Sequence, residues 1–408
     1  MPRKSFVSTI LSRFLNQASP TTRLDSAPLS LLTSVAAALL IVNSALAQNG
    51  YLIRDVAVGN VPNQAPAINN AGAVSFINGG GGVSVWNGTG VSAVPTGGLS
   101  GFTSHTDIND SGVVAFTNGF GVYTSSVGGA LATVASQNVL PSGTIVDAPA
   151  INNNGTVVFT GGTFSFDEGT LQLYQSSGSA TPISLATLGT WGLGQEKPQP
   201  AINSEGAIVV GAHGINGAQS GVYLANVSGL TPVVTSTSFG DTFGAASINA
   251  NGQVFVGYSP LFGVGDLLKG TAQPLQVYGS TATSSFATFL YEGVAGGNAS
   301  INDHGNVAFL ADLRPYNAST SGGLFTGLDA VHDKVVMQGD PLDGSTIKEL
   351  DFGQFGLNNS GQITFWAELN NGQSGIFQAS LVPEPSSLIL AAIGGLALFL
   401  VARRRKAA

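Results

Sequence analysis

The sequence predicts an all-β fold, a seven-bladed β-propeller, and three observations lead to that prediction. A short Asn-x-x-Gly motif recurs seven times along the 408 residues. Alternating apolar residues flank each copy, which is the pattern of a β-hairpin. Successive copies are 40 to 56 residues apart, and a period near that length with four short strands per unit is typical of propeller blades.

Each copy of the motif has an Asn followed by a Gly three residues later. An Asn side chain can bond to the backbone two residues on, and Gly adopts positive φ without a Cβ clash. Each copy therefore predicts a hairpin turn with a bulge. The predicted turn residues are Asn69 and Gly72, Asn109 and Gly112, Asn152 and Gly155, Asn203 and Gly206, Asn249 and Gly252, Asn302 and Gly305, and Asn358 and Gly361.

The positions around each Asn share their chemistry from copy to copy. The residues five and seven positions after the Asn are apolar, so they share one face of a strand. The residue two positions before the Asn always has a short side chain: Ala67, Asp107, Ala150, Ala201, Ser247, Ser300 and Gly356. A strand that carries only short side chains is crowded, which is expected of the innermost strand around a central axis.

The two ends of the array predict a closed ring. The seventh unit has three predicted strands and stops at Leu381, while an apolar run, Tyr51–Val58, precedes the first unit. We predict that this run supplies the missing outer strand, beside Ile376–Ala379. Closure leaves only short, protected sheet edges. An extended β-solenoid is the alternative.

The N-terminal segment, residues 1–47, has the pattern of a signal peptide. A basic region comes first, followed by the short apolar run Leu31–Leu46 and the small-x-small site Ala45-Leu46-Ala47. The alternative is an N-terminal membrane anchor. Residues 48–381 form the predicted ectodomain.

The C-terminal segment, residues 382–408, contains three parts in sequence. Pro383-Glu384-Pro385 breaks secondary structure, Leu388–Ala402 is apolar, and Arg403-Arg404-Arg405 begins a basic tail. The apolar run has about the minimum length of a membrane helix. A basic cluster retains its own end in the cytoplasm, so we predict one transmembrane helix with the propeller outside.

This tail resembles the PEP-CTERM sorting signal of Gram-negative and related bacteria. The resemblance implies recognition by an exosortase, cleavage near the motif, and delivery to the cell surface or the extracellular matrix. Such proteins are often associated with extracellular polysaccharide and biofilm.

The array is similar to tandem-repeat proteins with an Asn-x-x-Gly-x-x-Ala-Phe signature. Val114-Ala115-Phe116 and Val307-Ala308-Phe309 match its end, and Gln338-Gly339-Asp340-Pro341 matches a segment common in them. Ile208-Val209-Val210 departs from it, so blade four is expected to pack differently. The resemblance implies no established activity.

Composition and motifs exclude several functions. The ectodomain has six basic and 20 acidic residues, a balance of −14, which argues against nucleic-acid binding. There is no cysteine for a disulfide or thiolate site. Gly79–Gly82 lacks the strand and helix of a dinucleotide site, and no hydrolase, zinc-protease or P-loop motif occurs. We predict no cofactor.

A few residues remain as site candidates. A Ca²⁺ site at the Asn109 and Asn302 turns is a minor alternative, because those loops carry few acids. Asp107 is expected at the channel, solvated at its mouth rather than ligand-binding, and His304 is expected to be solvated in its turn. The tryptophans Trp86, Trp191 and Trp366 could stack on sugars, although core packing suits the first and third better.

Two functions remain open. The first is a non-enzymatic surface or matrix protein that binds polysaccharide or protein. The second is an extracellular propeller enzyme, a glycosidase or lyase, which needs carboxylates or a His converging on one end of the channel. The short inner-strand residues favour the first.

Overall fold

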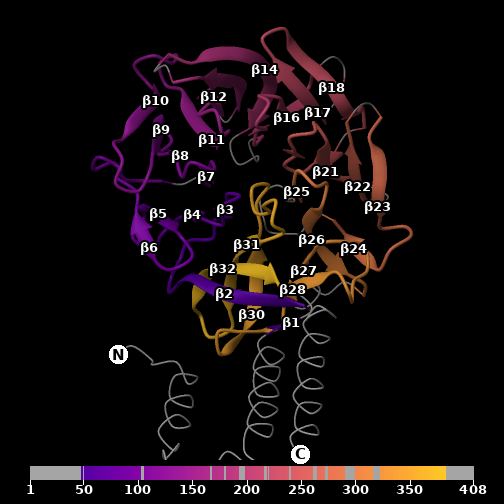
Figure 1. Cartoon of the computed structure of the whole chain (residues 1–408). Helices are drawn as coiled ribbons and strands as arrows, with labels where there is room; N and C mark the ends of the chain where they lie inside the picture. The colour runs from indigo at the N-terminus through magenta and orange to yellow at the C-terminus, as the bar shows by residue number, and fades with distance from the viewer. Residues whose placement is uncertain are drawn as a thin grey trace, which may run out of the picture. The chain divides into compact units, whose positions relative to one another are not determined.

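The computed structural model describes residues 47–382, except residues 49, 103–104, 166–167, 179–180, 193–197, 216–217, 219, 239, 261–263, 272–273, 290–298 and 316–321. The described residues from Gln48 onward belong to one compact unit. Within this unit, seven antiparallel sheets follow one another around a ring (Figure 1). The seven-bladed propeller is therefore confirmed, and the β-solenoid alternative is wrong.

Each blade runs from an inner to an outer strand. The inner strands are β3 (Ala67–Ile68), β7 (Asp107–Ile108), β11 (Ile145–Ile151), β15 (Ala201–Ile202), β20 (Ser247–Ile248) and β25 (Ala299–Ile301). In blade seven the inner position is a single bridge from Leu357 to Ile363. The second strands are β4 (Val74–Ile77), β8 (Val114–Thr117), β12 (Val157–Ser165), β16 (Ile208–His213), β21 (Val254–Ser259), β26 (Val307–Leu313) and β31 (Ile363–Leu369).

The outer half of each blade is equally regular. The third strands are β5 (Val83–Trp86), β9 (Gly121–Ser125), β13 (Glu168–Ser176), β17 (Ser220–Asn226), β22 (Asp266–Gly270), β27 (Gly322–Phe325) and β32 (Ser374–Leu381). The fourth strands are β6 (Val91–Ala93), β10 (Ala132–Ser136), β14 (Ile183–Gly192), β18 (Gly229–Ser236), β23 (Gln276–Ser280), β28 (Lys334–Met337) and β2 (Tyr51–Val58).

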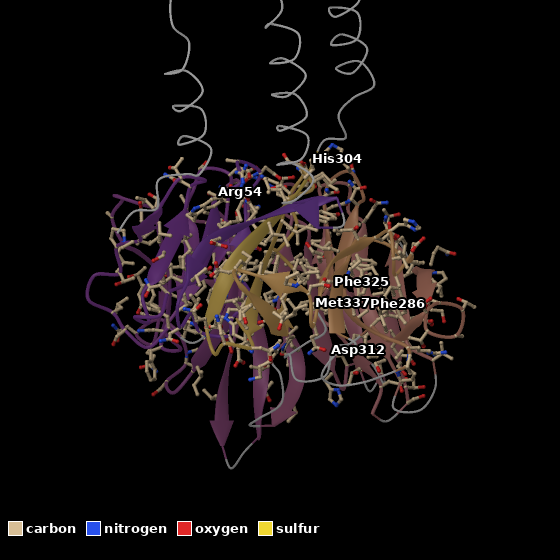
Figure 2. All side chains as sticks on the ribbon, turned by 90° about the horizontal axis from the view of Figure 1, so that it is seen from below. Arg54, Phe286, His304, Asp312, Phe325 and Met337 are labelled. Carbon is tan, nitrogen blue, oxygen red and sulfur yellow. The ribbon has the colours of Figure 1, made fainter. Side chains whose placement is uncertain are left out.

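Five short additions extend these sheets. They are β1 (Ala47–Gln48), β19 (Thr242–Phe243), β24 (Phe286–Thr288), β29 (Pro341–Leu342) and β30 (Ser345–Asp351). β19 and β24 pair with the far ends of the second strands of blades five and six, and β30 does the same in blade seven. Figure 2 places His304, in a turn, on one face of the ring and Asp312, at the far end of β26, towards the other face.

The first strand of the ectodomain closes the ring. β2 pairs antiparallel with β32, with Tyr51 opposite Leu381 and Val58 opposite Gly375. One further bond, from the Val382 N–H to the Gly50 carbonyl at 2.8 Å, extends the pairing. The predicted outer strand beside Ile376–Ala379 is therefore confirmed.

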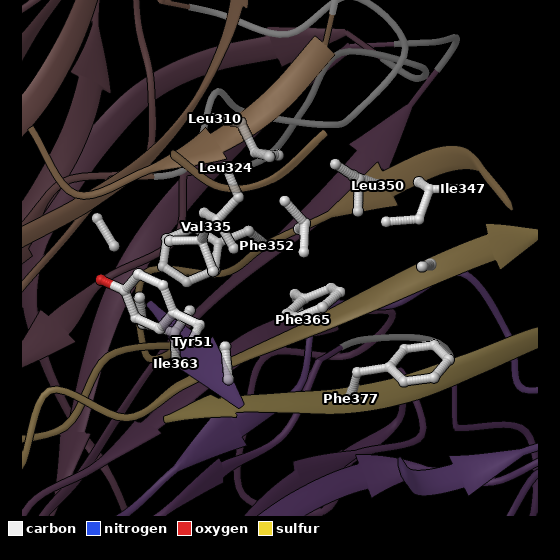
Figure 3. Close-up of a cluster of buried hydrophobic side chains, with 14 of the residues drawn as sticks. Tyr51, Leu310, Leu324, Val335, Ile347, Leu350, Phe352, Ile363, Phe365 and Phe377 are labelled. Carbon is white, nitrogen blue, oxygen red and sulfur yellow. The ribbon is translucent and has the colours of Figure 1, made fainter. Parts of the chain in front are cut away.

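Buried hydrophobic side chains form seven clusters in the described structure, one between each pair of neighbouring blades. The residues five and seven positions after each Asn always belong to the cluster shared with the preceding blade, as Val74 and Phe76 do between blades seven and one. Figure 3 shows the cluster between blades six and seven, where Tyr51 of β2 packs with Leu324, Phe352 and Phe365.

Blade four contributes to the same kind of cluster as the other blades, but its core differs at the position of Val210. Val210, which takes the place of Phe, is fully buried in the cluster between blades three and four. Tyr223 of β17 lies opposite Val210 in the sheet and occupies the same cluster. In blades two, three, six and seven a Tyr or Phe also lies opposite the Phe of this position, so blade four has one aromatic ring where those blades have two.

The turn chemistry is the same in all seven copies. In each, the Gly N–H donates to the Asn carbonyl, and the Asn N–H donates to the carbonyl four residues on. Every motif Gly has φ between 71° and 84°, a region that residues with a Cβ rarely adopt. These bonds and φ values describe a hairpin turn that closes through a left-handed Gly.

Replacing Gly155 by Val is expected to destabilise the protein by about 1 kcal/mol or more, because a β-branched residue cannot easily hold φ at 78°. Nothing within 4 Å would obstruct the new Cβ, so the effect reports backbone strain alone. Gly90→Val is the matched control, since Gly90 has equal space and no positive φ. Equal unfolding midpoints for the two variants would contradict the expectation.

Candidate functional site

The turn end of the inner strands surrounds a depression of about 160 Å³ on the axis of the propeller. All seven blades contribute to its wall, each with the motif Asn and the residues beside it. The structure thus brings together seven predicted turn residues that lie up to 289 positions apart in the chain. This depression is the candidate functional site.

The seven asparagines form a closed ring of hydrogen bonds. The side-chain Nδ2 of each Asn donates to the backbone carbonyl of the Asn in the next blade. The donor–acceptor distances are 2.9 Å from Asn69 to Asn109, 3.1 Å from Asn109 to Asn152, 3.2 Å from Asn152 to Asn203, 2.8 Å from Asn203 to Asn249, 2.9 Å from Asn249 to Asn302, 3.0 Å from Asn302 to Asn358 and 3.0 Å from Asn358 to Asn69.

The other end of each Asn side chain holds its own turn. In all seven copies Oδ1 accepts the backbone N–H four residues on, as Asn152 does from Thr156 at 2.9 Å. In four copies Oδ1 also accepts the N–H two residues on, which is the bond expected from the sequence. Each motif Asn side chain therefore forms hydrogen bonds both within its own turn and to the next blade.

The residues after the asparagines add a second set of bonds between blades. The carboxylate of Asp110 accepts from the Asn70 backbone N–H at 2.8 Å and from the Asn153 side chain at 2.7 Å. Asp303 occupies the corresponding position in blade six and bonds to Asn359 at 2.7 Å. Asp110 and Asp303 are the acidic residues of the two turns considered for Ca²⁺. Both form hydrogen bonds to a neighbouring blade, which argues against a role as Ca²⁺ ligands. The described residues contain no cluster of three or more His, Cys, Asp or Glu that could hold a metal.

A segment of blade seven, Phe352–Gly356, closes the channel below the depression. It precedes β31 and reaches the middle of the ring in gold in Figure 1. Gln354 donates to the carbonyl of Pro200 in blade four at 3.0 Å, and the Phe355 carbonyl accepts from Ile68 in blade one at 3.0 Å. We call Phe352–Gly356 the channel plug.

The aromatic ring at the centre of the channel plug contacts several blades at once. Phe355 packs against the clusters between blades one and two, three and four, and four and five. Gly356 is required beside it, because a Cβ there would collide with the ring of Phe352. The channel plug was not predicted from the sequence. The local signal for it is the pair Gly353 and Gly356, where a Cβ would come too close to neighbouring atoms.

Asp107 is buried, with 7% of its surface exposed, so the expectation of a solvated carboxylate is wrong. Its two oxygens accept the backbone N–H groups of Ile108 and Ile151, each at 2.8 Å, and the second bond joins blade two to blade three. Burial raises the pKa of Asp107 to about 7, and the two backbone bonds lower it only in part. This residue lines the depression.

Stability is expected to fall with rising pH through the titration of Asp107. Because its folded pKa lies above the ordinary value of 3.8, the folded state binds more protons than the unfolded state between about pH 4 and pH 7. The free energy of unfolding therefore decreases across that window, by about 1.4 kcal/mol per unit of pKa shift at most. Asp107→Asn should flatten this part of the stability–pH curve measured by urea unfolding. An unchanged slope would contradict the assignment.

The histidines and tryptophans occupy separate environments. His304 is exposed in its turn, as expected. The ring of His105 lies 6.0 Å from that of Phe355, and burial lowers the pKa of His105.

Trp86 and Trp366 are buried in the cluster between blades seven and one, which confirms their core assignment. The Trp366 indole N–H donates to Val61 at 3.0 Å.

Several predicted residues lie outside the described part of the chain. These are the signal segment 1–46, the side chain of Trp191, and the sorting residues Pro383, Glu384, Pro385, Arg403, Arg404 and Arg405. Among the described residues, no helix is long and apolar enough to cross a membrane.

Two family models match this chain. The PEP-CTERM protein-sorting motif covers residues 381–406, and a family of unknown function, DUF7453, covers residues 348–389. The C-terminus thus carries a PEP-CTERM motif, which implies export and sorting by an exosortase. No curated protein matches the sequence significantly.

Solved structures resemble the chain only distantly. Polysaccharide lyase Uly1 is 9% identical with a TM-score of 0.45, over 79% of this chain and 91% of that one. A six-bladed fungal lectin from Aleuria aurantia is 10% identical with a TM-score of 0.41, over 70% and 99%. A gluconolactonase from Xanthomonas campestris is 10% identical with a TM-score of 0.38, over 81% and 98%. At these scores the likeness carries no argument about function.

Proposed function

We propose that this protein is an exosortase-sorted surface or matrix protein that acts as a non-enzymatic binding or structural propeller, with extracellular polysaccharide as its partner. The observation that carries the proposal is the state of the central channel. The seven motif asparagines and the three carboxylates around it form hydrogen bonds between blades, and the channel plug crosses it. In propeller enzymes of the kind considered above, this is where reactive groups would have to converge.

The acidic residues around the depression form hydrogen bonds of this kind between blades. Asp107, Asp110 and Asp303 are the carboxylates of its wall. Each accepts hydrogen bonds that join neighbouring blades. A glycosidase needs a pair of carboxyl groups directed at one bond of the substrate, whereas these three are directed at backbone and amide groups of the protein itself. This arrangement favours a rigid scaffold over a catalytic centre.

Incubation of the purified protein with extracellular polysaccharide from its native cells tests the proposal. We expect co-sedimentation with the polymer and no shortening of it. The control is the same incubation with protein unfolded by heat. New reducing ends, or the absorbance of an unsaturated sugar product, would show a hydrolase or a lyase and would overturn the non-enzymatic assignment.

The sorting tail gives a second expectation. We expect a membrane-held precursor that is cut near Pro383–Pro385 and released. The basic cluster prevents the tail from slipping through the membrane, since moving one Arg or Lys into hydrocarbon costs about 2.5–3.5 kcal/mol. Mass spectrometry of the surface fraction should find peptides that end near the motif. Intact peptides that run through Arg403 would show a permanent anchor instead.

A further inference from the structure

A second cavity lies away from the axis, between blades five and six. Its volume is about 560 Å³, within the range of about 300–1,000 Å³ found for ligand pockets. Its walls are the outer strand β23, the segment that follows it, and Leu328 from the connection between β27 and β28. We call it the inter-blade groove.

Tyr278 in the wall of this groove departs from the pattern of the other blades. The outer strands of blades two, three, four, six and seven each contain a β-bulge that leaves one residue without a partner across the sheet. At the position beside the partner of the third-strand aromatic residue, that residue is a buried Val or Leu: Val134, Leu185, Val233, Val335 and Val56. In blade five the corresponding bulge, between Val277 and Gly279, contains Tyr278. Bulges commonly redirect a side chain next to a functional site.

The surroundings of Tyr278 keep its ring in place. Its ring packs edge-to-face with Phe255, the centroids 5.7 Å apart. The ammonium group of Lys269 lies 5.5 Å from the ring centroid and also donates to the Gly305 carbonyl of blade six at 2.6 Å. Tyr278 is half-buried, and its hydroxyl group forms no hydrogen bond within the described structure. A rigid ring with an available hydroxyl is suited to ligand contact.

The segment after β23 brings hydroxyl groups to the same groove. It follows Ser280, the last residue of β23, and leads to β24. Ser284 Oγ donates to the Ser280 carbonyl at 2.7 Å, and Arg314 holds the adjacent Thr281 carbonyl at 2.6 Å. Thr283 and Ser285 are exposed, and their hydroxyls form no hydrogen bond in the described chain.

The groove also has apolar surface beside these hydroxyls. Val277 is 59% exposed, and Leu328 lies over Gly279, where any Cβ would collide with it. Sugars have the matching chemistry, because a pyranose ring presents an apolar C–H face and a rim of hydroxyl groups. The excess of acidic residues in the ectodomain disfavours an anionic ligand.

We propose that the inter-blade groove binds a neutral saccharide segment, with Tyr278 as its aromatic platform and Thr283 and Ser285 as hydrogen-bonding groups. This inference rests on the proposed function and names its binding site. The central depression is then structural, and recognition occurs at the side of the ring.

The test uses the full chain in a detergent without sugar groups, with cellohexaose and the acidic hexagalacturonate as probes, by isothermal titration calorimetry. Tyr278→Val installs the residue type that other blades use, so it should fold. Phe120→Ala is the control, because Phe120 is a 61% exposed aromatic residue in a turn of blade two. Thermal unfolding of both variants verifies the fold.

We expect cellohexaose to bind, Tyr278→Val to weaken this binding at least tenfold, and Phe120→Ala to leave it unchanged. If Tyr278→Val and the natural protein bind cellohexaose with equal affinity, the inter-blade groove is not the binding site. The proposed polysaccharide-binding function would not be affected by that result. Preference for hexagalacturonate would overturn the assignment of a neutral ligand. Absence of binding to either probe, together with failure to sediment with native polysaccharide, would overturn both proposals.

Discussion

Removing residues 48–58 is expected to destabilise the propeller more than any single substitution. β2 is the outer strand of blade seven, and its loss removes all of the pairing from Tyr51 to Val58. Tyr51 is buried in the cluster between blades six and seven, and Val56 in the cluster between blades seven and one. Burial of each such side chain stabilises a fold by about 1.5–3 kcal/mol, so the two together account for much of a typical domain's net stability.

The unpaired edge of β32 is the second consequence of that deletion. An exposed strand edge pairs readily with other chains, so we expect aggregation as well as a lower unfolding temperature. Light scattering and circular dichroism measure the two effects. A synthetic peptide of residues 48–60 added in trans should restore both, which separates loss of the strand from general damage. A truncated protein that stays monomeric and melts at the same temperature would contradict the closure.

Asn358→Ala is expected to destabilise the protein by about 2–4 kcal/mol. The Asn358 side chain closes the ring of asparagines by donating to the Asn69 carbonyl at 3.0 Å, and its Oδ1 accepts the N–H groups of Ser360 and Gln362. Truncation removes the buried bond to Asn69 and the two part-buried bonds of the turn, and a buried polar group that loses its partner costs about 1–3 kcal/mol. Chemical denaturation gives the free energy directly.

Asn358→Asp separates the two functions of that side chain. An Asp keeps the acceptor for the turn, but it loses the amide donor and places a carboxylate beside the Asn69 carbonyl. If the ring matters, this variant should be nearly as unstable as Asn358→Ala above the carboxyl pKa. Asn370→Ala, which removes an exposed bond to Thr346, is the control. If Asn358→Asp is as stable as the natural protein, the amide donor of Asn358 does not contribute to stability, and its side chain acts only as an acceptor in the turn.

The blades were predictable because their signals are local. The Asn and Gly of each turn, and the apolar residues five and seven positions on, reflect backbone conformation and strand alternation that a short window of sequence contains. The pairing of Tyr51–Val58 with the last blade was predictable for a different reason. The sequence has a predicted strand without a partner before the first unit and only three strands in the last unit. Pairing that strand with the last unit accounts for both.

The ring of asparagines was only half predictable. An Asp or Ser could also accept the N–H groups of such a turn, yet all seven copies use Asn. That exclusive choice indicates a need for an amide donor, which the turn alone does not explain. The acceptor, one blade away, lies 40 to 56 residues distant in six copies and 289 residues distant in the seventh, and no local pattern identifies it.

The channel plug and the burial of Asp107 were not predictable from the sequence. Phe352–Gly356 follows no strand period, and its partner Pro200 is 154 residues away from Gln354. Asp107 occupies a position where other units have Ala, Ser or Gly, so its carboxylate suggests solvent. The two backbone N–H groups that allow its burial become neighbours only after blades two and three pack together.

The strand that closes the ring also sets an order of events during export. A chain that crosses the membrane with its N-terminus first delivers β2 long before β32, which ends next to the sorting motif. The ring therefore stays open until nearly the whole ectodomain has emerged, and contacts across such a sequence separation form slowly. The bond between Val382 and Gly50 is then among the last to form. A cut upstream of Leu381 would remove residues that hold β2, so maturation preserves the fold only if cleavage falls beyond Val382.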